Sequence, residues 1–295
     1  MPKSPKKEAN SIHEALRTIG EDIINLDIRD LAIEWSKKIS SNAPIIGIKS
    51  VADISSFEGM LAKSPSGDGW MIGVNDQINS AGRIRFTIAH EFGHFILHRN
   101  IQERFECSNQ DMHSWDAQGR DIEFEADTFA SYLLMPIDDF RKQVDGQSFS
   151  FDLLRHCADR YGVSLTAAAL KWREIAPGRV IVMAAIDGFL SWSCSNARAF
   201  RSGAYFATRK DVIEIPTGSV LLDASRSAAG FSKRVAANLW LPRELPDTDI
   251  IEHAFLIDGE DFSYTLGVLL LPDYERPQWD DGEDEFEPLT GVPSF

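Results

Sequence analysis

We predict an α+β fold, with a mainly helical N-terminal domain that carries a small sheet and a β-rich C-terminal domain. Two observations support this prediction. Before about residue 176, apolar residues recur mostly at helical spacing. After Pro177–Gly178 they form short runs typical of strands. A length of 295 residues suits one large domain or two smaller ones.

The helical part begins with a pattern that resembles a capping box. Ser11 with Glu14 predicts a helix that stops at Gly20. A strand is predicted at 69–75, just before the longest helix, and Pro136 closes the helix that follows. The further helices are predicted at Ile28–Ile39, Ala81–His98, Asp121–Met135, Phe151–Arg160 and Leu165–Ile175.

The β-rich part follows the change of pattern near residue 178. Strands are predicted at Val180–Ile186, Leu190–Cys194, Val212–Ile215, Val220–Leu222, Val235–Leu241, Ile250–Ile257 and Ser263–Leu271. The chain then divides into a helical extension, a helical domain, a β-rich domain with a regulatory or recognition role, and an acidic tail. The predicted bounds are 1–26, 27–176, 178–272 and 273–295.

Charge and composition exclude several classes of protein. The formal net charge is −15, and residues 273–287 supply −7 of it from eight acids and one arginine. Nucleic-acid binding needs clustered cations, so no direct binding to nucleic acid is expected. No apolar run is long enough to span a membrane, and no secretory signal opens the chain. Three scattered cysteines, Cys107, Cys157 and Cys194, predict no disulfide framework and favour a cytoplasmic location.

The central motif is His90-Glu91-Phe92-Gly93-His94. Histidines four residues apart on a helix lie on one face, so both imidazoles can bind one ion. Glu91 points about 100° around the axis and can take a proton from water without ligating the metal. A zinc ion lowers the pKa of bound water toward ~7, which suits a carboxylate base.

A third ligand is expected from the second long helix. Glu123 and Asp127 share one face of it, beside two alanines that permit close approach to the histidine helix. Glu123 is the better ligand, and Asp127 is placed as an outer acceptor for the N–H of a ligand histidine. Glu125 points nearly the opposite way and is interpreted as a solvated charge.

Two segments now point to a family. The run from Phe86 to His98, FTIAHEFGHFILH, and the run from Glu123 to Pro136, EFEADTFASYLLMP, resemble the ImmA/IrrE family of zinc metallopeptidases. The resemblance covers roughly residues 30–175 and implies a zincin-like domain with one Zn²⁺ ion. It implies ligands at His90, His94 and Glu123. The family commonly has Asn where this chain has Asp127, which keeps an acceptor and adds a charge.

The resemblance also implies a biological setting. Family members are intracellular peptidases that typically cleave or control a helix-turn-helix repressor, in mobile elements, stress responses or toxin–antitoxin pairs. It therefore implies a protein substrate, namely a DNA-binding repressor, and gives no reason to expect a membrane partner.

Substrate contacts are predicted less directly. The strand that carries Trp70, Ile72 and Val74 is a candidate edge for pairing with an extended peptide, although an ordinary core strand fits the same pattern. His98 lies ~6 Å beyond His94 along the helix, so it is placed as a helix-terminal residue or a substrate contact. The donor to the transition-state oxyanion stays open among Arg83, Tyr161, His98 and His113.

Two functions remain in view. The first is a zinc-dependent endopeptidase in which Glu91 is the general base. The alternative is a toxin or regulatory binding module that keeps the metal fold and acts through protein contacts. Glu91 favours the enzyme, because a purely structural metal site has no need of that carboxylate.

Overall fold

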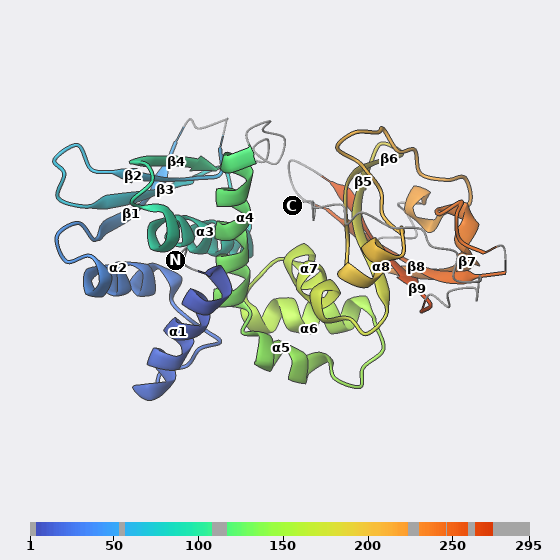
Figure 1. Ribbon diagram of the computed structural model, residues 1–295, viewed down its shortest axis with the longest axis horizontal. Helices are drawn as coiled ribbons and strands as arrows, with labels where there is room; N and C mark the ends of the chain where they lie inside the picture. The colour runs from blue at the N-terminus through green and yellow to red at the C-terminus, as the bar shows by residue number, and fades with distance from the viewer. Residues whose placement is uncertain are drawn as a thin grey trace, which may run out of the picture. The chain divides into compact units, whose positions relative to one another are not determined.

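The computed structural model describes residues 4–52, 57–107, 117–223, 230–245, 247–258 and 263–273 (Figure 1). The predicted acidic tail lies outside these residues from position 274 on. Contacts divide the chain into two compact units, and unit 1 ends at Ala168 while unit 2 begins at Ala169. The α+β class is confirmed, with helices and a small sheet in unit 1 and a larger sheet in unit 2.

The sheet of unit 1 has four strands in the order β1-β3-β2-β4. They are β1 (Ile45–Val51), β2 (Gly59–Lys63), β3 (Trp70–Asn75) and β4 (Arg104–Cys107). β1 runs parallel to β3, and the other two pairings are antiparallel. The sequence pattern predicts β3 alone of these strands. The other three are short or mix apolar and exposed positions.

The prediction that strand 70–75 presents an exposed edge to substrate is wrong. β3 is hydrogen-bonded on one side to β1 and on the other to β2, so no edge of its backbone is left for a peptide. Trp70, Ile72 and Val74 are buried core residues rather than substrate contacts. Within the described residues, β4 forms the edge of the sheet next to β2.

Among the described residues, seven helices belong wholly or partly to unit 1. They are α1 (Pro5–Thr18), α2 (Ile28–Ile39), α3 (Ala81–His98), α4 (Ala117–Leu134), α5 (Ile137–Val144), α6 (Phe151–Tyr161) and α7 (Leu165–Ile175). α1 begins at Pro5 rather than near Ser11, whose hydroxyl donates to the Lys7 carbonyl inside the helix. Proline suits a first helical turn, which explains the earlier start.

α2 and α3 pack against the sheet of unit 1, and α4 crosses α3 and packs against it (Figure 1). Ser80 caps the N-terminus of α3 with its side-chain oxygen. Ile88, Phe92 and Phe95 are fully buried on α3, so one stripe of this helix belongs to the core. The packing fixes the opposite, polar stripe of α3 between the sheet and α4.

Unit 2 is built on a five-stranded antiparallel sheet in the order β6-β5-β9-β8-β7. The strands are β5 (Arg179–Ile186), β6 (Phe189–Ser195), β7 (Phe231–Ala236), β8 (Asp249–Ile257) and β9 (Tyr264–Leu271). Three short elements connect these strands along the chain: the helix α8 (Ala197–Arg201) and the 3-10 turns η2 (Val220–Leu222) and η3 (Ala237–Leu239).

Three of the predicted strands in unit 2 need correction. Residues 212–215 form only an isolated bridge, between Glu214 and Phe189. Residues 220–222 form the turn η2, which Ser219 caps. The segment predicted at 235–241 is a strand only to Ala236 and then turns into η3. Apolar runs this short do not distinguish a strand from a buried turn.

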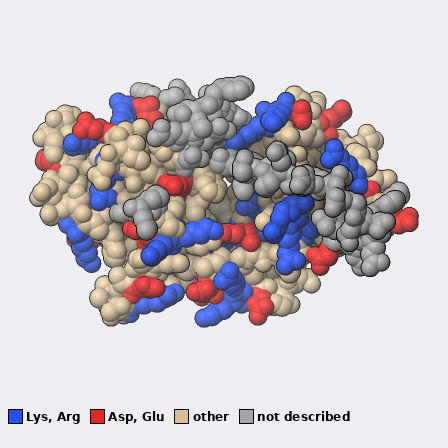
Figure 2. Space-filling view, in the orientation of Figure 1, with Lys and Arg blue, Asp and Glu red and all other residues tan. Residues whose placement is uncertain are grey.

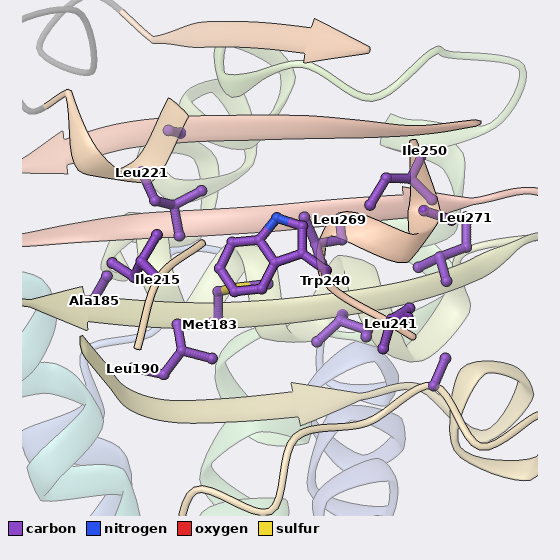
Figure 3. Close-up of a cluster of buried hydrophobic side chains, with 14 of the residues drawn as sticks. Met183, Ala185, Leu190, Ile215, Leu221, Trp240, Leu241, Ile250, Leu269 and Leu271 are labelled. Carbon is purple, nitrogen blue, oxygen red and sulfur yellow. The ribbon is translucent and has the colours of Figure 1, made fainter. Parts of the chain in front are cut away.

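One hydrophobic core cluster of unit 2 lies on one face of its sheet (Figure 3). Trp240 from the turn after η3 packs among Met183 of β5, Leu269 of β9 and Leu221 of η2. Glu252 of β8 is fully buried beside this core. One of its carboxylate oxygens accepts from the Trp240 indole N–H and the other from the Val220 backbone N–H.

Glu252 is therefore expected to hold both turns onto the sheet. Replacing Glu252 with Ala leaves two buried donors without acceptors, each costing about 1–3 kcal/mol of unfolding free energy. Urea denaturation followed by tryptophan fluorescence should show that loss. Glu252→Gln keeps one acceptor and should lose less, and Asp249→Ala at an exposed position of β8 is the control. Equal stability of Glu252→Ala and the control would refute the role.

Other features of the described chain are unexceptional. Acidic and basic side chains are interspersed over the face shown in Figure 2. No helix among the described residues is long and apolar enough to cross a membrane. Cys157 and Cys194 are free thiols in buried positions.

Candidate metal centre

The polar stripe of α3 meets α4 at three donor atoms. His90 Nε2 lies 3.0 Å from His94 Nε2 and 3.1 Å from Glu123 Oε2. His94 Nε2 lies 3.3 Å from Glu123 Oε1. One donor atom from each residue lies within 4.8 Å of the others. The structure thus brings together the three residues that the sequence indicates as ligands.

This geometry fits a divalent ion. A tetrahedral zinc site with bonds of ~2.0–2.1 Å places its donor atoms about 3.3 Å apart, close to the separations found here. Lone pairs on two imidazoles and a carboxylate this close together repel one another unless protons or a cation lie between them. A divalent cation can replace those protons, because ligands bind metals in their deprotonated form. Two imidazoles and a carboxylate are also a donor set that zinc accepts.

The surroundings of His94 and Glu123 favour the protonation states that bind a metal. Burial lowers the pKa of His94 to about 4, so its imidazole is neutral at neutral pH and has a lone pair to give. Burial alone would raise the pKa of Glu123, but hydrogen bonds with His90 and His94 outweigh it. The pKa of Glu123 is therefore lowered and its carboxylate is ionised.

Asp127 lies where an outer acceptor is needed. Its Oδ1 is 2.8 Å from His90 Nδ1, on the side of the ring away from the donor cluster. With an Nδ1–H donated to this carboxylate, the lone pair of His90 lies on Nε2, where a metal would bind. The position of Asp127 one turn after Glu123 produces this contact, because both residues lie on the face of α4 that meets α3.

Close packing between α3 and α4 brings the donors within reach. Gly93 lies against α4, and a Cβ there would stand 3.0 Å from the Phe129 ring and 3.2 Å from the Ala126 backbone. A side chain at this position requires the Phe129 ring or the α4 backbone to give way. Since the histidines belong to α3 and Glu123 to α4, the spacing of the donor set depends on Gly93.

The sheet holds Glu91 from the other side. The Glu91 side chain is fully buried one residue after His90. Gly59, the first residue of β2, packs so tightly there that a Cβ would lie 2.6 Å from Glu91 Oε1 and 2.5 Å from Thr87 Cγ2. A residue without a side chain is therefore needed where β2 passes the carboxylate.

Comparison with known proteins now identifies the domain. Residues 53–173 match the family model described as the IrrE N-terminal-like domain of the M78 peptidases. The domain belongs to the ImmA/IrrE family. The resemblance seen in the two sequence runs is thereby confirmed, and with it a metallopeptidase-like domain that has a possible His/His/Glu metal site.

Solved structures also resemble this chain, and one of them covers most of it. It is a Mycobacterium tuberculosis transcriptional regulator, 14% identical, with a TM-score of 0.56 over 90% of this chain and 76% of that one. At this identity the likeness shows a shared fold alone. No curated protein matches the chain in sequence.

Two expectations for this ImmA/IrrE domain need correction. Glu125 does not face away from α3: its side chain is partly exposed, but its Oε2 lies 2.8 Å from His98 Nε2. A helical projection records the direction of each Cα–Cβ bond and misses the reach of a glutamate side chain. His98 is no substrate contact, since it is buried at 2% exposure and both ring nitrogens are engaged.

Two of the remaining candidates for oxyanion donor in the ImmA/IrrE domain are also engaged elsewhere. Arg83 forms a two-pronged ion pair with Glu58. The Tyr161 hydroxyl donates to Asp139. His113 lies outside the described residues.

Sequence reasoning missed two further residues of the ImmA/IrrE centre. Phe105 of β4 stacks on the His94 ring, with centroids 4.6 Å apart and planes inclined by 23°. Gly59 packs on Glu91 from β2. Both lie in strands that were not anticipated, so no signal in the sequence could place them beside α3. Their positions follow only from the pairing of β2 with β4.

Proposed function

We propose that this protein is a zinc-dependent endopeptidase. The observation that carries the proposal is the convergence of His90, His94 and Glu123 beside the buried carboxylate of Glu91. The match to an M78 peptidase domain supports the same reaction class. Zinc is proposed over other divalent metals because two imidazoles and one carboxylate leave a fourth position open, as catalytic zinc sites do.

In the proposed reaction, Glu91 transfers protons and Asp127 orients a metal ligand. When bound, a zinc ion polarises a peptide carbonyl and lowers the pKa of water. Glu91 takes a proton from the attacking water and delivers it to the leaving nitrogen. Its burial beside Gly59 keeps the carboxylate in one position, which lowers the entropy lost on reaching the transition state. Asp127 orients His90 through its Nδ1.

An extended peptide would bind along β4. This strand has a partner on one side only among the described residues, and its Phe105 stacks on His94. Backbone pairing with such an edge gives affinity that tolerates many sequences. The edge strand thus replaces β3 in the role that the sequence suggested.

The substrate we propose is a DNA-binding regulator of the repressor type, cleaved or controlled in a mobile element, stress response or toxin–antitoxin pair. The support is the family resemblance of the two motif runs. The acidic segment 273–287 would suit docking of a basic partner, because eight acids lie within it. The β-rich unit 2 is proposed to recognise or regulate. A cytoplasmic setting fits such a substrate.

Metal removal tests the activity. Treatment with a zinc chelator should lower cleavage of an unfolded protein and of a quenched peptide library by about a hundredfold or more. One equivalent of zinc should restore cleavage in the wild-type protein but not in His94→Ala. Cleavage that survives complete removal of metal would refute the proposal.

A further inference from the structure

We propose that His98 and Glu125 form a positioning pair that holds the His94 ring in its metal-binding tautomer. The inference rests on the metal centre of the proposed function. It concerns how this chain orients one ligand through two side chains that supply no donor atom to the metal and, in the proposed reaction, do not touch the substrate.

The evidence is a chain of hydrogen bonds on the far side of His94. His94 Nδ1 lies 3.1 Å from His98 Nδ1. His98 Nε2 lies 2.8 Å from Glu125 Oε2. The opposite nitrogen of His94, Nε2, faces His90 and Glu123. Each ring nitrogen of the two histidines therefore has a neighbour of its own.

Proton positions follow from this arrangement. A metal at His94 Nε2 needs the lone pair there, so the ring carries its proton on Nδ1. That proton points at His98 Nδ1, which must accept it and must therefore carry its own proton on Nε2. The Nε2–H then points at the Glu125 carboxylate, which accepts it. Only this tautomer pair satisfies every group.

Burial makes the pair consequential. His94 has no exposed surface and His98 only 2%, so water cannot replace His98 as the acceptor beside His94. An imidazole N–H buried without an acceptor is unfavourable in free energy. Without His98, the population of the other His94 tautomer, which carries its proton on Nε2 and blocks the metal, would rise. The Glu125 side chain is 39% exposed, so the chain of hydrogen bonds ends at the surface.

The two ligand histidines thus differ in how they are supported. His90 reaches its carboxylate, Asp127, directly. His94 is covered by the stacked ring of Phe105 and reaches a carboxylate only through a second imidazole. Partners of this kind typically change metal affinity 10–100-fold when removed.

Zinc affinity, measured by competition with a chromophoric chelator, tests the pair without any assay of cleavage. His98→Leu and Glu125→Ala should each raise the zinc Kd by about 10–100-fold. Glu125→Gln should restore near-wild-type affinity, because its side-chain carbonyl still accepts from His98 Nε2. His156→Leu, which replaces an exposed histidine on α6, should leave the Kd unchanged.

A spectroscopic readout separates positioning from folding. In the zinc-loaded wild-type protein, ¹⁵N NMR should show His94 protonated at Nδ1 and His98 at Nε2. In Glu125→Ala the His98 Nε2–H signal should lose its hydrogen-bonded shift, while the backbone spectrum stays folded.

The outcomes are distinct. Unchanged zinc affinity and unchanged histidine signals in His98→Leu and Glu125→Ala overturn the pair. A wild-type protein that fails to bind zinc overturns both the pair and the metal centre. A protein that binds zinc, depends on the pair and yet cleaves no peptide overturns the proposed activity alone.

Discussion

Replacing Glu91 with glutamine is expected to lower peptide cleavage by about 10²–10⁴-fold while zinc stays bound. Glutamine has nearly the same shape but cannot take a proton from water. The buried site beside Gly59 should accept it, because the side-chain volume is kept. Turnover of a quenched peptide and zinc content per chain are the two measurements. Glu34→Gln, on the exposed face of α2, is the matched control.

The same variant separates the two functional classes. An enzyme that binds substrate but cannot cleave it should retain that substrate, so a pull-down with Glu91→Gln should enrich one regulator over the wild-type protein. If the biological effect persists unchanged in Glu91→Gln, the protein acts through contacts alone and the endopeptidase proposal fails. Recovery of only nonspecific proteins would count against a dedicated substrate.

Replacing Gly93 with valine is expected to abolish zinc binding at micromolar concentrations. A Cβ at this position already meets the Phe129 ring and the Ala126 backbone at 3.0–3.2 Å, and valine adds two further methyl groups. Overpacking of this kind costs ~1–3 kcal/mol, and the strain is relieved by moving α3 away from α4. Glu123 then separates from the two histidines.

Gly93→Ala should show a smaller loss, about tenfold in zinc affinity, because one methyl group needs only a few tenths of an ångström. Gly178→Ala is the control, since a Cβ there meets only the Leu271 carbonyl at an ordinary 3.5 Å. Circular dichroism must show that Gly93→Val still folds. Wild-type zinc affinity in a folded Gly93→Val would refute the role of close packing.

Much of the fold could be predicted because helical signals are local. A few turns of local sequence encode the apolar stripe of α3, its N-terminal cap and the spacing of His90 and His94. Strands are different, because their placement depends on partners far away in the chain. The sequence of β3 fits an edge strand and a core strand equally well. Only the pairing with β1 and β2 distinguishes the two.

The candidate site divides in the same way. His90, His94 and Glu123 were accessible because ligand spacing on helices follows from the helical repeat. The contact between Glu125 and His98 was not, because it depends on how two helices cross and on side-chain reach. Gly59 carries no chemistry of its own, so nothing in the sequence singled it out.

The position of Gly59 links two tasks mechanically. In register, Gly59 of β2 pairs with Cys107 of β4, the strand proposed to receive substrate, and it also abuts Glu91. A peptide that pairs with β4 would extend the sheet on the far side of β4 from β2. The next strand, β2, contacts the general base Glu91 through Gly59. The paired strands β2 and β4 would then both bind the substrate and position Glu91. A peptide that pairs incorrectly with β4 would also meet a misplaced general base.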